Sequence, residues 1–143
     1  MHFWHDFHIT GYTVNGAQRE LAFDLLWPYE SASDVRRARI VFGGVEAYHL
    51  EHDLGGNIVH GFAERPLREF LEAWAEHFAL NCKYGWPRFW RSMPHPPRPV
   101  AWELEAAHQS LAERGAKCIE LASSYGLSGW VVAATLREEV IVR

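Results

Sequence analysis

The sequence has few cysteines and no long apolar run. Its two cysteines, Cys82 and Cys118, lie far apart and outside any CxxC pattern, so the spacing of a zinc site or a disulfide framework is missing. The longest strongly apolar run, residues 130–136, is well short of the roughly 18 residues that cross a bilayer. The N-terminus also lacks a basic segment followed by an apolar one. We therefore expect a cytoplasmic protein with reduced thiols and no membrane segment.

A strong excess of one charge is missing too. The formal net charge at pH 7 is −4, which gives no argument for nucleic acid or an anionic membrane as a partner. The distribution is uneven, because residues 40–64 hold four acidic residues and no Lys or Arg, whereas residues 77–102 hold four basic residues and no acid. This pattern indicates a polarised molecule. Seven tryptophans are more than one core of this size needs, so some rings are expected on a binding surface.

Motifs for catalysis by serine, cysteine or a bound nucleotide are absent. No serine stands in a GxSxG elbow, and neither cysteine has the sequence signature of a Cys-His-Asn site. The glycine pairs at residues 43–44 and 55–56 lack the GxGxxG spacing and the strand-to-helix context of a phosphate-binding loop. The sequence therefore assigns no catalytic residue and no cofactor.

Strand patterns fill the first 62 residues. Asn15-Gly16 lies between two segments rich in β-branched and aromatic residues, and this dipeptide strongly favours a two-residue hairpin turn with positive φ at both positions. The Gly43-Gly44 pair predicts a bulge or tight bend within a continuous strand pattern. The expected strands of this N-terminal β-meander cover residues 5–14, 19–27, 37–42, 45–52 and 58–62.

The pattern changes to a helical period at Pro66. Apolar residues on one face predict a single helix from Pro66 to about residue 81, and five prolines in residues 86–99 predict an irregular loop. A second helix is expected over residues 101–114, with Gly115 as its C-terminal cap. The inward-facing residues of the two helices are Leu67, Phe70, Leu71, Trp74, Phe78, Trp102, Leu104, Ala107 and Leu111.

The C-terminus returns to strand patterns over residues 117–125 and 130–142. Residues 131–134 are apolar on both faces, which predicts a strand buried between a helical layer and another part of the core. Together the patterns predict one α+β domain over residues 1–143. Its antiparallel sheet would combine the N-terminal meander with the C-terminal hairpin, and both helices would pack on one face.

The acidic region contains a candidate site on one strand. His49, Glu51 and Asp53 alternate along one face, and Glu46 precedes them. If His60 lies opposite on a paired strand, the imidazoles and carboxylates could bind a metal or act as acid and base. The same alternation describes an ordinary solvated sheet face, which we favour, so no metal site is assigned.

The histidine-rich start of the chain gives a weaker metal hypothesis. His5 and the pair Asp6 and His8 fall on opposite faces if this segment is extended, and the terminal His2 adds little. We therefore expect no metal site here.

Residues 83–98 form the one segment whose composition is not explained by the secondary structure predicted for it. Four bases and four aromatic rings occur within sixteen positions, a mixture typical of protein-binding hot spots and also of single-stranded nucleic-acid grooves. The small number of bases and the negative net charge favour a protein partner over nucleic acid. Alternatively, the rings fold back over the sheet as a lid. The candidate partner-binding residues are Tyr84, Trp86, Arg88, Phe89, Trp90, Arg91 and Arg98.

The first 50 residues carry a pattern that resembles small uncharacterised bacterial proteins. Some of these are similar to immunity proteins encoded beside polymorphic toxins. The resemblance implies a non-catalytic inhibitor that binds one toxin, and it assigns no functional residue. It rests on the segments Trp4-His5-Asp6-Phe7-His8-Ile9, residues 20–26 and residues 38–45.

The leading hypothesis is a non-catalytic protein-binding module, with an immunity-type inhibitor as its narrower form, and with residues 83–98 or the acidic region 46–53 as its partner surface. One alternative is a small metal-dependent or acid/base enzyme that uses His49, Glu51, Asp53 and His60. Another is a structural or oligomer-forming protein, such as a homodimer in which residues 83–98 swap onto a neighbour. Charge polarity and surplus aromatic rings without a catalytic signature favour the first.

Overall fold

The computed structural model describes the backbone of residues 4–81 and 100–143 and the side chains of residues 4–80 and 104–143. It has the predicted α+β class, with one eight-stranded antiparallel sheet and three helices. The strands are β1 (His8–Asn15), β2 (Glu20–Leu26), β3 (Arg37–Gly43), β4 (Ala47–Glu51), β5 (Asn57–Arg65), β6 (Lys117–Tyr125), β7 (Ser128–Ala133) and β8 (Thr135–Val142). The helices are α1 (Leu67–Ala73), α2 (Ala75–Asn81) and α3 (Val100–Glu113).

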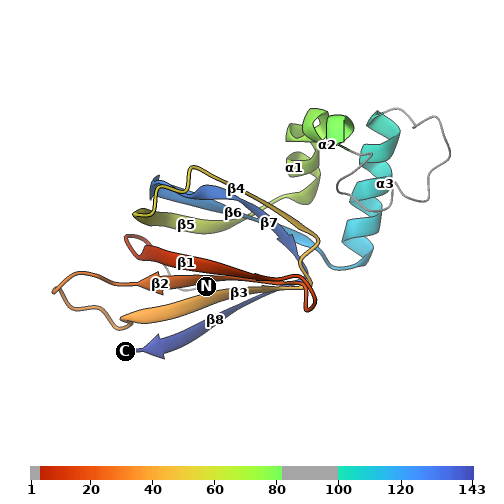
Figure 1. Ribbon diagram of the computed structural model, residues 1–143. Coiled ribbons are helices and arrows are strands. Elements are labelled where there is room, and N and C mark those ends of the chain that lie inside the picture. The colour runs from red at the N-terminus through yellow and green to blue at the C-terminus, as the bar shows by residue number, and fades with distance from the viewer. Residues whose placement is uncertain (1–3, 82–99) are drawn as a thin grey trace.

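The sheet bends into two facing layers. Its strand order is β4-β7-β6-β5-β1-β2-β3-β8, and β5 joins β1 through only two residue pairs, His8 with Ile58 and Ile9 with Asn57. Figure 1 shows β4, β7, β6 and β5 above β1, β2, β3 and β8. We call these groups the upper layer and the lower layer.

The chain crosses between the layers at two bends. The Gly43-Gly44 pair carries it from β3 to β4, as predicted, and Ala134 carries it from β7 to β8, so the expected single strand over residues 130–142 is divided. The amide of Ala134 donates to the carbonyl of Gly43 at 3.0 Å. A Cβ on Gly44, whose φ is +59°, would lie 2.9 Å from the Cβ of Ala134. The bend therefore requires a residue without a side chain.

The first crossing also corrects the predicted meander. Only β1, β2 and β3 are consecutive neighbours, because the chain leaves the lower layer after β3 and enters the upper layer at its edge as β4. The strand that follows, β5, lies at the opposite side of the upper layer. The hairpin at Asn15-Gly16 is present, but Asn15 pairs with Glu20, so the turn spans residues 16–19 rather than two residues.

The main core fills the space between the layers. Alternate residues of β2 and β3 point inward and are fully buried, among them Leu21, Phe23, Ile40 and Phe42. Residue Val131 of β7 faces this core, whereas its neighbour Val132 faces the helices. This arrangement confirms the predicted strand with two buried faces.

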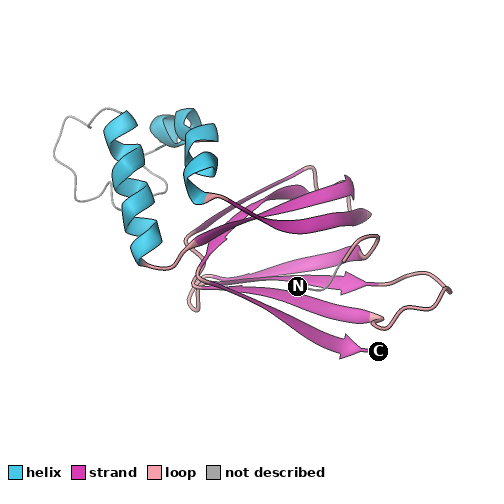
Figure 2. Cartoon of the chain, turned by 180° about the vertical axis from the view of Figure 1, so that it is seen from behind, coloured by secondary structure: helices cyan, strands magenta, loops and turns pink. Residues whose placement is uncertain are grey.

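The helices pack on the outer face of the upper layer, and the outer face of the lower layer has no helix against it among the described residues (Figure 2). The predicted helix from Pro66 is two helices, because the backbone at Trp74 (φ −104°, ψ 8°) ends α1 before α2 begins. The break lets Phe70, Trp74 and Phe78 surround Trp130, with ring centroids 4.7, 5.4 and 6.1 Å away. No helix in the described part of the chain is long and apolar enough to cross a membrane.

Candidate functional site

The helix-facing side of β4 brings His49 and Glu51 together. A carboxylate oxygen of Glu51 lies 3.5 Å from His49 Nε2. The His49 ring stacks on Trp130 and also contacts Trp74 and His77, with centroids 5.0 and 5.9 Å away. The His49 side chain is only 32% exposed, so the interpretation of this strand face as an ordinary solvated one is wrong at His49.

Glu46 does not belong to an open acidic face. It lies in the connection before β4, its side chain is 9% exposed, and Arg114 Nε is 2.8 Å from its carboxylate. Arg19 lies 3.3 Å from the same oxygen. The acidic region is therefore less polarised than its composition predicts, because two arginines distant in sequence neutralise Glu46.

Asp53 lies beyond the end of β4, in the loop to β5, and so does not continue the face of His49 and Glu51. Its carboxylate accepts hydrogen bonds from Asn57 Nδ2 at 2.8 Å and from the Gly55 amide at 3.1 Å. The Asn57 hydrogen bond, followed by that of Gly55, holds the pKa of Asp53 below its usual value. Asp53 therefore remains ionised at neutral pH.

His60 is separated from the other members of the predicted set. It lies on β5, and both β6 and β7 stand between β5 and β4. The ring of His60 contacts His5 instead, with centroids 5.1 Å apart. The expected pairing of His60 with the His49 strand is wrong, and within residues 4–80 and 104–143 no three His, Cys, Asp or Glu residues are grouped to hold a metal ion.

The N-terminal histidines also lie differently from the expected extended geometry. Strand β1 begins only at His8, and Asp6, with φ of +69°, forms part of the preceding turn. The Nδ1 atom of His5 lies 3.1 Å from the Asp6 carboxylate. His8 Nε2 lies 3.3 Å from the hydroxyl of Tyr29. The first contact joins neighbours in the sequence, and the second joins β1 to the loop after β2.

Cys118 is a buried residue of β6. Burial raises the pKa of its thiol to about 12. A thiol of this kind is protonated and a poor nucleophile at neutral pH.

The second predicted partner surface, residues 83–98, lies outside the described residues. This applies to every candidate assigned to it, namely Tyr84, Trp86, Arg88, Phe89, Trp90, Arg91 and Arg98. The orientation expected for Trp102 also lies outside the described side chains.

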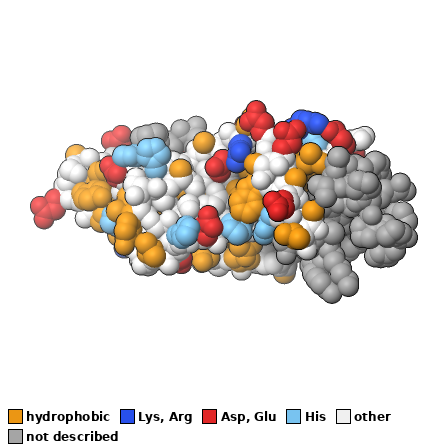
Figure 3. Space-filling view, turned by 90° about the horizontal axis from the view of Figure 1, so that it is seen from above, with side chains coloured by type: hydrophobic (Ala, Val, Ile, Leu, Met, Phe, Trp, Pro, Cys, Tyr) orange, Lys and Arg blue, Asp and Glu red, His pale blue; other side chains and the backbone are white. Residues whose placement is uncertain are grey.

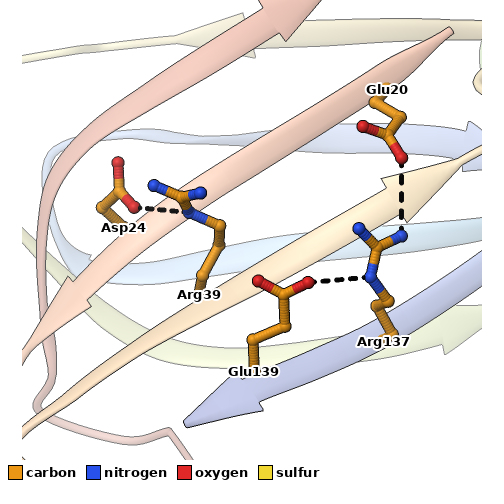
Figure 4. Close-up of polar contacts among 5 residues, drawn as sticks. All are labelled: Glu20, Asp24, Arg39, Arg137 and Glu139. Atoms are coloured by element: carbon orange, nitrogen blue, oxygen red, sulfur yellow. Dashed lines mark hydrogen bonds and ion pairs between the residues drawn. The ribbon is translucent and has the colours of Figure 1, made fainter. Parts of the chain in front are cut away.

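One cluster that the sequence did not reveal lies on the outer face of the lower layer. Figure 4 shows Asp24 of β2 beside Arg39 of β3, and Arg137 of β8 between Glu139 and Glu20. Arg39 Nε donates to Asp24 at 2.9 Å, and Arg137 Nε to Glu139 at 2.9 Å. The charged residues within the strand patterns at 37–39 and 137–139 were a signal, but the partner of each charge depends on which strands are neighbours in the sheet.

No protein-family model, curated protein or solved structure matches the chain. The candidate surface is thus defined by residues of the β4 edge strand, whose Tyr48 and His49 point to opposite faces, and of the loop after it: Tyr48, His49, Glu51, Asp53 and Leu54, which we call the β4 surface. Tyr48 and Leu54 are 42% and 59% exposed despite being apolar. Figure 3 shows histidine and carboxylate side chains among hydrophobic ones on the face seen from above, with Lys and Arg mainly toward the helices.

Proposed function

We propose that this protein is a non-catalytic protein-binding module and that the β4 surface is its partner site within the described residues. The observation that carries the proposal is the combination of exposed apolar and ionised groups at one sheet edge. Tyr48 and Glu51 are exposed residues of β4, and Asp53 and Leu54 are exposed in the loop that follows it. Exposed rings and aliphatic groups next to fixed charges are typical of protein-recognition surfaces.

Packing beneath the β4 surface supports this proposal. The contacts of His49 with Trp74 and Trp130 hold the strand against the helical layer. Asp53 is fixed by Asn57 and Gly55. A surface whose side chains are already fixed loses little conformational entropy when it binds.

The partner that fits the β4 surface presents basic groups. Glu51 is an exposed carboxylate, and the low pKa of Asp53 keeps a second negative charge nearby at neutral pH. A shallow hollow of about 360 Å³ beside Tyr48, lined also by Val14 and Arg19, offers room for an apolar group. Basic residues flanked by an apolar anchor on the partner would complement both features.

The form of binding that the N-terminal resemblance implies is neutralisation of a toxin. An inhibitor of this kind occupies a surface of the toxin and performs no chemistry itself. The proposal of an immunity-type role therefore rests on that resemblance and on the binding character of the β4 surface.

The test uses the product of the adjacent gene as the binding probe. We expect co-expression with this chain to relieve any growth arrest that the product causes, and the two purified proteins to form a complex measurable by calorimetry. The double variant Glu51→Gln/Asp53→Asn should weaken binding by about tenfold or more, because two charged hydrogen-bonding groups are lost. The matched control is Glu30→Gln/Asp34→Asn, which removes two exposed carboxylates from the loop between β2 and β3.

Two outcomes would contradict parts of the proposal. Unrelieved arrest together with no complex argues against an inhibitor of the adjacent product. A complex that the β4 variant leaves unchanged but that Trp90→Ala/Arg91→Ala weakens would place the partner site in residues 83–98.

A further inference from the structure

Two β-bulges lie at the same level of the lower layer, one on each side of a hollow. In β1, the pairing with β2 shifts between Ile9 and Gly11, so Thr10 is the extra residue. In β8, the pairing with β3 passes from Val140 to Val142, so Ile141 is the extra residue. Bulges bend and twist a strand locally and are frequent beside binding sites.

The hollow between the bulges has a volume of about 370 Å³ and opens on the outer face of the lower layer. Its lining includes both bulge residues, and Ile141 is 57% exposed. The residues between them come from β2 and β3. The full lining is Thr10, Asp24, Leu25, Arg37, Ala38, Arg39 and Ile141.

The two arginines of the hollow differ in how far they are neutralised. Arg39 donates through Nε to Asp24 at 2.9 Å, and Figure 4 draws no bond to its two terminal amino groups. Arg37 is exposed and makes no ion pair with any residue of the described part. The lining therefore carries one acidic and two basic groups, a net charge of about +1.

We propose that this hollow binds a carboxylate group attached to a short aliphatic chain. A guanidinium binds a carboxylate through two parallel N–H···O hydrogen bonds. The guanidinium of Arg37 can donate both bonds, because it makes no ion pair in the described part of the chain. Ile141 supplies apolar contact for the aliphatic part, whereas the side chains of Leu25 and Ala38 are buried in the main core on the other face of the layer. The ligand is either a small aliphatic carboxylic acid or a glutamate side chain of a protein.

The acidic residues around the hollow favour a ligand with one negative charge over a ligand with two. Asp24 lines the hollow and raises the pKa of Arg39 through its hydrogen bond and charge, and the charge of Glu139 adds a smaller rise in the same direction. A monoanion neutralises the net charge of about +1 on the lining, and the second charge of a phosphate dianion would meet no uncompensated positive group. The binding site is independent of the β4 surface, which belongs to the other layer.

The test is a titration of the full chain with sodium butyrate, followed by backbone amide NMR shifts, with sodium chloride at equal ionic strength as the reference. We expect saturable shifts confined to residues near Thr10, Asp24, residues 37–39 and Ile141. The variant Arg37→Gln should weaken binding by about tenfold, because a charge-assisted hydrogen bond is lost. Arg37→Lys should be intermediate, since it keeps the charge but loses the fork.

The control for loss of positive charge is Arg68→Gln on α1, which should leave butyrate binding unchanged. Phosphate that binds more tightly than butyrate would overturn the assignment to a carboxylate. Absence of saturable shifts at these residues, with the variants folded by circular dichroism, would overturn the site. Titration with N-acetyl-glutamate amide distinguishes the two sources, because tighter binding than butyrate favours a protein side chain.

Discussion

Among the described residues, Asn57 is the one polar side chain in the buried set. Its Oδ1 accepts from the amides of Leu127 at 2.8 Å and Leu54 at 3.1 Å, which joins the β4–β5 loop to the β6–β7 turn. We predict that Asn57→Ala lowers the free energy of unfolding by about 2–3 kcal/mol, because two amides lose their acceptor. Urea denaturation measures this change.

The control for Asn57 is Asn15→Ala, at an exposed asparagine whose Oδ1 accepts from the Gln18 amide. Water can replace that acceptor, so a loss below about 1 kcal/mol is expected. Equal losses for the two variants would contradict the role given to burial. The sequence did not single out Asn57, because its partner Leu127 is 70 positions away.

At the scale of a strand pair, Gly129 determines how closely β4 approaches β7. A Cβ on Gly129, whose φ is +155°, would lie 1.8 Å from the carbonyl oxygen of His49. We predict that Gly129→Ala costs about 3 kcal/mol or more of unfolding free energy, since backbone must move to relieve the contact. Amide hydrogen exchange should show loss of protection in β4 before other strands.

The matched control is Gly61→Ala in β5, where a Cβ would meet nothing within 4 Å. We expect it to change stability by less than about 1 kcal/mol. A comparable loss at both glycines, or unchanged protection of β4 in Gly129→Ala, would contradict the role given to Gly129.

The sequence predicts whether a segment is a helix or a strand where its hydrophobic periodicity and its turn residues indicate the same element. The helical face at Phe70, Leu71 and Phe78 and the bend at Gly43-Gly44 are confirmed. The breaks at Trp74 and Ala134 were missed, because contacts with Trp130 and the crossing between layers cause them rather than a local breaker. In the candidate site, the contact of His49 with Glu51 follows from alternation, whereas the separation of His60 follows only from strand order.

At the scale of the whole molecule, the two layers and the helices meet at Glu46. Arg19 reaches it from the β1–β2 turn of the lower layer, and Arg114 from the end of α3. The sequence predicted one sheet with helices on one face. It did not predict that the sheet folds into two layers, because that depends on contacts between residues far apart in the chain. Glu46, which the sequence placed in an acidic partner surface, therefore connects the lower layer, the upper layer and α3.

We predict that Glu46→Gln lowers the free energy of unfolding by about 1–3 kcal/mol, because the carboxylate is nearly buried while both arginines are about half exposed. The control is Glu64→Gln, whose exposed carboxylate lies 3.7 Å from Lys117 and should contribute less than about 1 kcal/mol. Urea denaturation at low and high salt separates the cases, since salt screens the exposed pair more completely. A loss in Glu46→Gln no larger than in Glu64→Gln would contradict the role given to Glu46 in joining the layers and α3.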